Sequence, residues 1–524
     1  MRRAGILRWG PALVLAALVG GFLVAILQAN GRFTYTLDDP YIHLALAESI
    51  RGGTYGINPG EPASPASSIL WPLLLVPVIQ MPWAELWPLF LTTLSAFASL
   101  EVFRRLLQLG GDTYGDGQPL PTLLLLLLIP SANLVGLVFT GMEHSLHQVL
   151  TALAALGLIR VTRGELPRWL GPVLVLGPLV RFEGLAVSVP ALFFLAWRGH
   201  RRVAAAIGVA VAASLGTFVE FLLSLGLEPL PASVATKSSL IWRGLGAGTV
   251  YDNWKLNLEA VHGLSLALVG ILLILAGSGG WSRPLAERQL ALTVAGSCGL
   301  HLAFGRFGWY YRYEVYAWTF AVLVVLFLFR DTLATRVRSR GLLPVALVLI
   351  ALTAFSCLGY WRALSTTVPA ATNVYEQQYQ IHRFVTEHWR AGVAVNDIGW
   401  VAFRNPYEVL DLFGLASTEV LKARRSGGLA WMEELVLEHD IDCAMLFERW
   451  YPKLPKSWIK VGELHLRGRQ VTAAFDRVAI FATRPAAVQP LTERLVTWQR
   501  ELPDPQMLTL TPLSAPTPAP SSGP

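Results

Sequence analysis

The chain has 524 residues, of which 53% are hydrophobic and only 15% are charged, and its mean hydropathy is +0.48. Soluble proteins carry about a quarter of their residues as charged side chains. This composition therefore excludes a water-soluble protein and predicts a chain that lies mostly in lipid. The net charge of +7 does not indicate nucleic-acid binding, because the arginines cluster at the ends of apolar segments, where they orient membrane helices.

The N-terminus predicts a retained first membrane helix. Arg2, Arg3 and Arg8 precede an apolar run over about residues 9–27. This run is long enough to cross a bilayer and too long for the core of a cleaved signal peptide. Because basic residues flank the cytoplasmic ends of membrane helices, we expect the N-terminus in the cytoplasm.

Further apolar segments predict a polytopic α-helical membrane protein with about 11 to 13 membrane segments. They cover approximately residues 69–81, 86–107, 120–139, 144–160, 166–180, 184–197, 203–226, 256–276, 288–304, 315–330 and 341–360. The three cysteines lack the spacing of a metal site or a disulfide framework, and we expect them to be small buried residues.

Arginine-rich joins predict which ends of these segments are cytoplasmic. The basic joins lie at residues 104–105, 160–168, 198–202, 283–288 and 330–340. The joins between them are then extracytoplasmic, at residues 31–68, 140–143, 181–183, 227–255, 305–314 and after 361.

One inconsistency arises in this topology. Two apolar segments lie between the outer join 31–68 and the inner join 104–105, where only one crossing fits. The segment 69–81 is short for a span, so we interpret it as a half-helix or re-entrant piece. The alternative is that Arg104 and Arg105 break the orientation rule.

Residues 361–490 predict a small extracytoplasmic α/β domain. An amphipathic helical pattern covers residues 431–439, and four β-rich runs lie at residues 393–397, 407–412, 443–447 and 471–483. Alternation of strands and helices is typical of an α/β domain. Residues 491–524 form a Pro/Thr-rich tail, which we expect to be disordered from about residue 508.

An acidic pair, Asp38 and Asp39, directly follows the first membrane helix. Carboxylates at a membrane surface need water, a cation or hydrogen-bond donors nearby. Asp39 precedes Pro40 and fits the N-cap of a helix that runs to about Arg51, whereas capping does not explain Asp38. His43 lies one turn further on the same helix face, and two acids with an imidazole suit general-base catalysis or a cation site.

The first outer loop carries three short motifs in a fixed order: Asp38-Asp39-Pro40-Tyr41-Ile42-His43, Gly56-Ile57-Asn58-Pro59-Gly60-Glu61 and Ser64-Pro65. This order resembles the GT-C superfamily of membrane glycosyltransferases, and most closely the bacterial arabinofuranosyl-, aminoarabinose- and protein-mannosyl-transferase group. The resemblance is specific in this loop and diffuse in the other spans, and in architecture it covers residues 1–360.

The resemblance implies an inverting hexosyl- or pentosyltransferase of the cell envelope. Such an enzyme moves a sugar from a polyprenyl-phosphate donor to a lipid, glycan or protein acceptor, outside the bacterial inner membrane in which it lies. By this likeness a first-loop acid is the catalytic base, and the family's acidic pair matches Asp38 and Asp39. A further outer acid of the family matches Glu143 in Thr140-Gly141-Met142-Glu143-His144, although a solvated interfacial acid fits this position equally well.

The donor's phosphate needs cations on the same face, and the outer joins supply Arg181, Lys237, Arg306 and Arg312. Arginine can hold phosphate oxygens through paired, charge-assisted hydrogen bonds. Arg181 interrupts an otherwise continuous apolar hairpin, which favours a functional role. Lys237 and Arg306 fit equally well as side chains that snorkel to the interface.

Other polar and aromatic residues are less specific. Tyr310, Tyr311 and Tyr313 are more typical of an aromatic belt at the membrane surface than of a sugar platform. Asp397 follows a predicted strand, at the end where α/β domains bind ligands, but the sequence shows no partner for it.

The sequence leaves a divalent cation near Asp38, His43 and Glu143 open, and it indicates no other cofactor. It also leaves two rival functions open: a transporter or lipid-linked glycan flippase, and a non-catalytic assembly subunit. Transporters concentrate ionisable residues at the bilayer midplane, often within internal repeats. Here the acids and bases gather in the outer joins and no repeat is evident, which favours the transferase.

Overall fold

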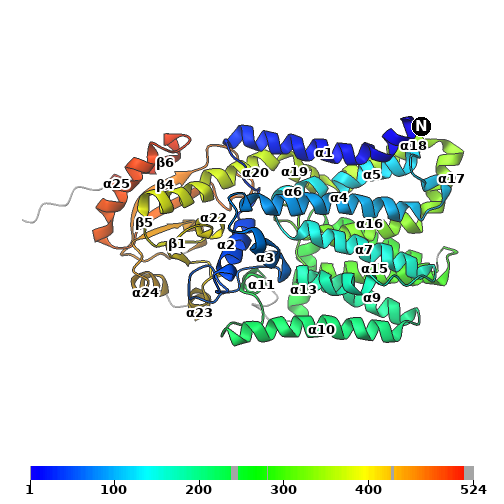
Figure 1. Cartoon of the computed structure of the whole chain (residues 1–524), viewed down its shortest axis with the longest axis horizontal. Helices are drawn as coiled ribbons and strands as arrows, with labels where there is room; N and C mark the ends of the chain where they lie inside the picture. Colours follow the sequence, from blue (N-terminus) through cyan, green and yellow to red (C-terminus); the bar gives the residue numbers. More distant parts are fainter. Residues whose placement is uncertain (1, 238–245, 280, 427–429, 452, 513–524) are drawn as a thin grey trace, which may run out of the picture.

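A computed structural model describes residues 2–237, 246–279, 281–426, 430–451 and 453–512. A helical membrane region occupies one part of the elongated molecule and a small α/β domain the other (Figure 1). This arrangement confirms the predicted fold class, a polytopic helical membrane protein with a C-terminal α/β domain. Cys298, Cys357 and Cys443 are buried and unpaired, as expected.

Five helices in the described part of the chain are long and apolar enough to cross a membrane, and up to eight spans result if each bent helix pair counts as one. These five are α1 (Arg2–Asn30), α4 (Trp87–Gln108) with the turn before it, the segment Pro119–Thr140 that contains α5 and α6, α7 (His144–Thr162) and α10 (Arg201–Ser224). A further long helix is α15 (Leu285–Phe304). Shorter apolar helices are α5 (Pro119–Ser131), α6 (Leu134–Thr140), α8 (Leu170–Val180), α9 (Leu185–Trp197), α14 (Gly263–Ser278), α16 (Val315–Leu328) and α18 (Leu342–Ser356).

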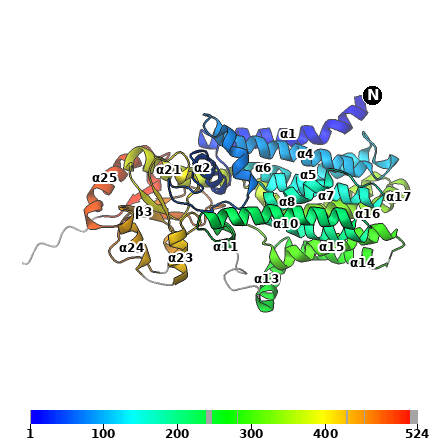
Figure 2. The same cartoon turned by 60° about the horizontal axis from the view of Figure 1, so that its bottom comes forward.

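Three pairs of consecutive helices are bent at a short break between them. The chain turns by 102° between α13 (Ala247–Glu259) and α14, by 60° between α16 and α17 (Arg330–Arg340), and by 73° between α18 and α19 (Leu358–Ser365). Figure 2 shows α13 projecting from the side of the helical bundle.

The short apolar segment 69–81 does not form a membrane span. It contains α3 (Leu70–Leu75) and a 3₁₀ turn at Val76–Val78, and the backbone N–H of Ile69 donates to the Leu179 carbonyl at the end of α8. The segment therefore stays on the side of the first loop, as the half-helix interpretation predicted. Only α4 then crosses between residues 31–68 and 104–105, which removes the inconsistency.

The basic joins gather at the end of the molecule that carries the N-terminus and α17 (Figure 1). Asp116 forms ion pairs with both Arg8 and Arg104, and Arg338 of α17 donates to Thr113. At the opposite end, α2 (Asp39–Arg51) packs against α22 (Gly399–Ala402) of the α/β domain. The first loop and the C-terminal domain thus share one end of the molecule.

The C-terminal domain contains a six-stranded sheet in the order β2-β1-β3-β5-β4-β6. The strands are β1 (Val393–Val395), β2 (Val409–Asp411), β3 (Cys443–Leu446), β4 (Ile459–His465), β5 (Arg477–Ala482) and β6 (Leu508–Leu510). The first three are parallel, and the other pairings are antiparallel. The four predicted β-rich runs correspond to β1, β2, β3 and β5, whereas β4 and β6 were not predicted.

Helices cover this sheet and extend beyond the expected domain boundary. They are α23 (Thr418–Ser426), α24 (Trp431–Glu438) and α25 (Val488–Gln499). Strand β6 pairs with β4, and Leu508 is buried opposite Leu464. The expectation of disorder from residue 508 was therefore wrong for residues 508–510, because these residues extend the sheet. Residues 513–524 lie outside the described part of the chain.

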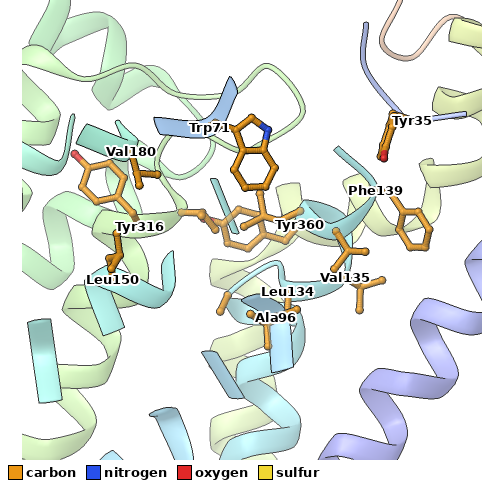
Figure 3. Packing of buried hydrophobic residues seen from close by; sticks show 14 of the residues in the cluster. Tyr35, Trp71, Ala96, Leu134, Val135, Phe139, Leu150, Val180, Tyr316 and Tyr360 are labelled. Atoms are coloured by element: carbon orange, nitrogen blue, oxygen red, sulfur yellow. The ribbon is translucent and has the colours of Figure 1, made fainter. Parts of the chain in front are cut away.

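A nearly continuous helical segment joins the two parts of the molecule. It runs from α19 through α20 (Thr367–Val374), α21 (Gln380–Arg383) and two π-helical stretches to Trp389. One cluster of buried apolar residues extends from the membrane helices into the domain, and a smaller cluster lies around Leu410, Val436 and Leu446. Figure 3 shows part of the larger cluster, with Trp71 of α3 pointing inward. The domain is therefore packed onto the membrane region rather than tethered to it.

If the two ends of the molecule lie on opposite sides of the membrane, cysteines introduced at each end should differ in their access to a reagent outside the cell. Ala486 in the domain and Ser339 in α17 are exposed, whereas the native cysteines are buried. A membrane-impermeant maleimide should label Ala486→Cys in intact cells, and Ser339→Cys only after permeabilisation. The reverse pattern would place the domain in the cytoplasm and contradict an extracytoplasmic site.

Candidate active site

The two first-loop acids occupy the start of α2. Asp38, not Asp39, holds the N-cap position, and the Asp38 side chain makes no capping hydrogen bond. Asp39 is the first helical residue and Pro40 the second. The expectation that Asp39 caps this helix was therefore wrong, because the helix begins one residue earlier than Pro40 suggested.

The Asp38 carboxylate binds the C-terminal domain. Its Oδ2 accepts a hydrogen bond from the backbone N–H of Gly399 at 2.7 Å, and its Oδ1 accepts one from the N–H of Trp400 at 2.8 Å. The first N–H groups of a helix have no partner within the helix and favour negative charge. The ring of Tyr41, on α2, lies 3.7 Å from that of Trp400 between centroids. Asp38 therefore joins the first loop to the start of α22.

A second acid of the domain lies close to this contact. Burial and the neighbouring Asp397 carboxylate raise the pKa of Asp38, against the two backbone N–H groups, which lower it. Burial also raises the pKa of Asp397, whose Oδ2 accepts a hydrogen bond from Gln378 Nε2 at 2.8 Å. The structure thus gives Asp397 the neighbour that the sequence did not reveal.

The raised pKa of Asp38 predicts how domain docking depends on pH. A carboxyl group with a raised folded-state pKa holds a proton that the unfolded chain releases. Its contribution to stability is therefore complete below the ordinary carboxyl pKa, about 4, and is lost as the pH rises through the raised value. We expect the thermal stability of the wild type to fall with rising pH more steeply than that of Asp38→Asn. If the melting temperatures of the wild type and of Asp38→Asn change equally as the pH rises above about 4, the pKa of Asp38 is not raised.

Asp39 has a different partner, a buried arginine in the loop 305–314. Arg312 Nη2 lies 3.1 Å from Asp39 Oδ1, and Arg312 Nη1 lies 3.4 Å from Oδ2. The Arg312 side chain is 2% exposed and that of Asp39 18%. Arg312 also donates to the hydroxyl of Tyr313 at 3.2 Å. A buried guanidinium requires such a carboxylate, so the pair fixes Asp39 against the loop.

Glu143 and Arg181 form a second buried ion pair. Glu143 Oε1 accepts from Arg181 Nη1 at 2.5 Å and from Ser67 Oγ at 2.9 Å. Arg181 Nη2 donates to Glu183 at 2.6 Å. His43 Nε2 lies 3.5 Å from Glu143 Oε2. Glu143 is fully buried, so it is not a solvated interfacial acid, and the Arg181 charge is balanced by two carboxylates.

These ion pairs border a cavity of about 480 Å³. Its polar wall includes Arg181, Glu183, Arg306 and Arg312. Its remaining wall is largely apolar and comes from α9, α15 and the turn before α9, with Phe182, Leu185, Ala186, Val189, Leu300 and Phe304. The cavity is therefore an apolar slot with guanidinium groups in one part of its wall.

The structure brings together three of the four cations that the sequence suggested. Arg181, Arg306 and Arg312 all line the cavity, and Arg306 is the exposed member. The Lys237 side chain lies outside the described residues. Its helix contributes Ser233 to the same cavity.

The tyrosines of loop 305–314 divide between two cavities. Tyr313 lines the cavity just described, whereas Tyr310 and Tyr311 line a separate one. The Tyr310 hydroxyl donates to the Ala363 carbonyl of α19 at 2.7 Å. The three tyrosines therefore line two different cavities, and they do not form one aromatic belt.

Sequence reasoning did not single out four residues that line this site: Ser67, Glu183, His301 and Tyr316, of which the last two are buried. His301 Nδ1 lies 3.0 Å from the Tyr316 hydroxyl, inside apolar helices. The sequence did contain a signal for two of these residues, Glu183 and His301. Glu183 follows Arg181 within an apolar hairpin, and His301 interrupts an apolar helix, and such residues are costly in a membrane without a function.

Asp38, His43 and Glu143 do not fit a shared metal ion. Asp38 is bound to backbone N–H groups of α22, and Glu143 is bound to Arg181. Within the described ranges, one group of His, Asp, Glu or Cys ligand atoms is close enough for an ion: Glu387, His388 and Glu501. That group lies in the C-terminal domain, where Arg383 already contacts both carboxylates.

The comparisons with known sequences concern the C-terminal domain. Residues 371–481 match a family model described as a domain of unknown function, DUF8728. The match runs from α20 to β5. No curated protein sequence matches the chain.

Three solved structures are similar to most of the chain. ArnT from Cupriavidus metallidurans bound to undecaprenyl phosphate is 11% identical, with a TM-score of 0.45, over 91% of this chain and 99% of that one. The apo oligosaccharyltransferase of Archaeoglobus fulgidus is 12% identical, with a TM-score of 0.48, over 88% and 75%. ArnT from Cupriavidus metallidurans in the apo state is 12% identical, with a TM-score of 0.41, over 91% and 98%. ArnT and this oligosaccharyltransferase are both GT-C glycosyltransferases.

Proposed function

We propose that the protein is a glycosyltransferase that moves a sugar from a polyprenyl-phosphate donor to an acceptor hydroxyl at the extracytoplasmic face of the bacterial inner membrane. The observation that carries this proposal is the 480 Å³ cavity, which combines an apolar wall with three guanidinium groups. One of these groups, that of Arg312, also binds the first-loop carboxylate of Asp39, which is not itself a lining residue. The first-loop motifs, which resemble those of the GT-C superfamily, support the same function.

The cavity suits a lipid-linked phosphate. An isoprenoid chain is apolar and would lie along α9 and α15, where Leu185, Val189 and Phe304 form the wall. The phosphate would bind the guanidinium groups of Arg306 and Arg312 that line the cavity, since arginine forms charge-assisted hydrogen bonds with phosphate oxygens. Arg181 would hold Glu143 in place and would not bind the phosphate, because two carboxylates balance its charge.

We assign the general base to Asp39 rather than to Asp38. Both Asp38 oxygens accept backbone hydrogen bonds from the C-terminal domain, whereas Asp39 is partly exposed and paired with a residue that lines the cavity. Asp39 would take the proton of the acceptor hydroxyl as its oxygen bonds to the sugar's anomeric carbon. The bond from that carbon to the phosphate oxygen breaks, and polyprenyl phosphate leaves with the electron pair. Arg306 and Arg312 would stabilise its added negative charge.

Transfer of label tests the proposal against a flippase. Membranes that contain the full chain would be supplied with radiolabelled polyprenyl-phosphate hexoses and pentoses. We expect label to move from the polyprenyl carrier into an acceptor fraction with wild-type protein and not with Asp39→Asn. If the label crosses the membrane but stays on the carrier for every sugar, the chain is a flippase and the transferase proposal fails.

Replacement of Arg306 should weaken donor binding without unfolding the protein. Arg306 is exposed, so Arg306→Ala removes a charge from the cavity and leaves the buried ion pairs intact. A hydrogen bond to a charged group contributes about 1.5–3 kcal/mol, so the dissociation constant of polyprenyl phosphate should rise at least about 10-fold. Arg306→Lys should restore part of this affinity. The matched control is Arg338→Ala, an exposed arginine at the opposite end of the molecule. Equal affinity in Arg306→Ala and Arg338→Ala would exclude Arg306 from the phosphate site.

A further inference from the structure

A second and larger cavity, of about 740 Å³, lies on the other side of loop 305–314. Its wall combines residues 308–311 of this loop, residues 469–474 of the C-terminal domain, and Arg362, Ser365 and Thr366 at the end of α19. None of these residues lines the 480 Å³ cavity. The two cavities are therefore distinct, and one loop forms part of the wall of each.

The charged residues that line the second cavity are all basic. Arg362 and Arg469 line it, and no acid does. Both side chains are exposed, and within the described part of the chain neither forms an ion pair. This contrasts with Arg181 and Arg312, whose charges are balanced by carboxylates. Two unbalanced guanidinium groups on the wall of one cavity favour an anionic ligand, and arginine binds phosphate oxygens through charge-assisted hydrogen bonds.

The position of the cavity indicates a membrane surface. Arg362 lies in α19, which follows the apolar helix α18 after a bend of 73°. Trp309, which lines the cavity, has 51% of its surface exposed, and Trp361, next to Arg362 in the chain, has 43%. Exposed tryptophans next to arginines are typical of the level of lipid headgroups. Arg469 reaches the same cavity from the C-terminal domain, on the water side.

The loop that forms the shared wall is held in an unusual conformation. Trp309, Tyr310 and Tyr311 have positive φ angles of 41°, 65° and 55°. Each such residue costs roughly 1–2 kcal/mol, so the surrounding contacts must hold the loop. Tyr310 is bound to α19, and Arg312 is bound to Asp39. The wall is therefore preformed, which lowers the cost of ordering it around a ligand.

We propose that this second cavity binds a lipid-borne phosphate, with Arg362 and Arg469 as its ligands. The source is either a phospholipid of the surrounding membrane or a phosphorylated lipid that the enzyme acts upon. Both present a phosphate anion at the headgroup level with an apolar part in the bilayer. The site does not depend on the glycosyltransferase proposal, because it shares no residue with the donor cavity.

Native mass spectrometry of the purified full chain with phosphatidylglycerol tests the site. Wild-type protein should bind phosphatidylglycerol more tightly than zwitterionic phosphatidylcholine. Arg362→Ala and Arg469→Ala should each weaken phosphatidylglycerol binding about 10-fold, and the double variant should weaken it further. Arg494→Ala is the matched control, since Arg494 is exposed in α25 of the same domain and lies outside the cavity. Melting temperatures confirm that the variants are folded.

Competition experiments and melting temperatures distinguish the two possible sources of the phosphate. If inorganic phosphate competes only weakly, the site requires the lipid part, as proposed. If phosphatidylglycerol raises the melting temperature of the wild type but not of the double variant, a membrane phospholipid is the ligand. If only an acceptor-lipid extract competes for the site, the ligand is a phosphorylated substrate lipid. Equal phosphatidylglycerol affinity in wild type, double variant and Arg494→Ala overturns the proposal.

Discussion

Asp39→Asn is expected to lower sugar transfer at least about 100-fold, because asparagine cannot accept the proton of the acceptor hydroxyl at neutral pH. The amide oxygen of the new side chain can still accept a hydrogen bond from Arg312, so the loop should keep its place. The dissociation constant for polyprenyl phosphate should therefore change only a few-fold. Single-turnover transfer with bound donor measures the chemical step apart from binding.

A matched control comes from the same helix. Glu48 is exposed at the far end of α2, where it accepts a hydrogen bond from the Arg404 backbone, so Glu48→Gln removes one negative charge away from the cavity. It should keep nearly full activity. Asp38→Asn should lose activity only in proportion to the loss of domain docking. If Asp38→Asn is inactive while its domain stays docked, the base is Asp38. If both variants are active, the first loop is not the catalytic centre.

Gly399→Ala is expected to destabilise the docking of the C-terminal domain by about 2–4 kcal/mol. A Cβ at this position would lie 2.2 Å from the Asp38 carbonyl oxygen and 2.5 Å from Asp38 Oδ2, so the backbone must shift. That shift breaks the two hydrogen bonds through which Asp38 holds α22. The variant should expose α22 to hydrogen exchange and to proteolysis while the membrane helices stay folded.

The control for this substitution is Gly468→Ala in the same domain. A Cβ at position 468 has nothing within 4 Å, and the φ angle there is not in the left-handed region. Its stability should equal that of the wild type. If Gly399→Ala docks as firmly as Gly468→Ala, the contact between Asp38 and α22 does not hold the domain. Asp38 would then be available for another role.

The sequence alone was sufficient for the class of protein and for much of its architecture. Composition and the lengths of the apolar runs depend on local residue types, so they indicated the membrane helices directly. Buried strands such as β1 and β3 are continuous apolar runs and were predicted. Strand β4 is partly exposed along its length, and the short strand β6 lies in a Thr/Pro-rich stretch of the sequence. Neither has a pattern strong enough to identify it without its partner strand.

The roles of the site residues were decided by tertiary structure. Asp38 and Asp39 are neighbours in the chain, and no local pattern separates their functions. Their partners are 361 and 273 residues away, Gly399 in the domain and Arg312 in an outer loop. Successive residues at the start of a helix point in different directions, so adjacent acids meet different elements. The sequence therefore determined that two carboxylates stand directly after the first membrane helix. Only the packing of the domain against the helices decided which one binds the domain and which one binds the cavity-lining Arg312.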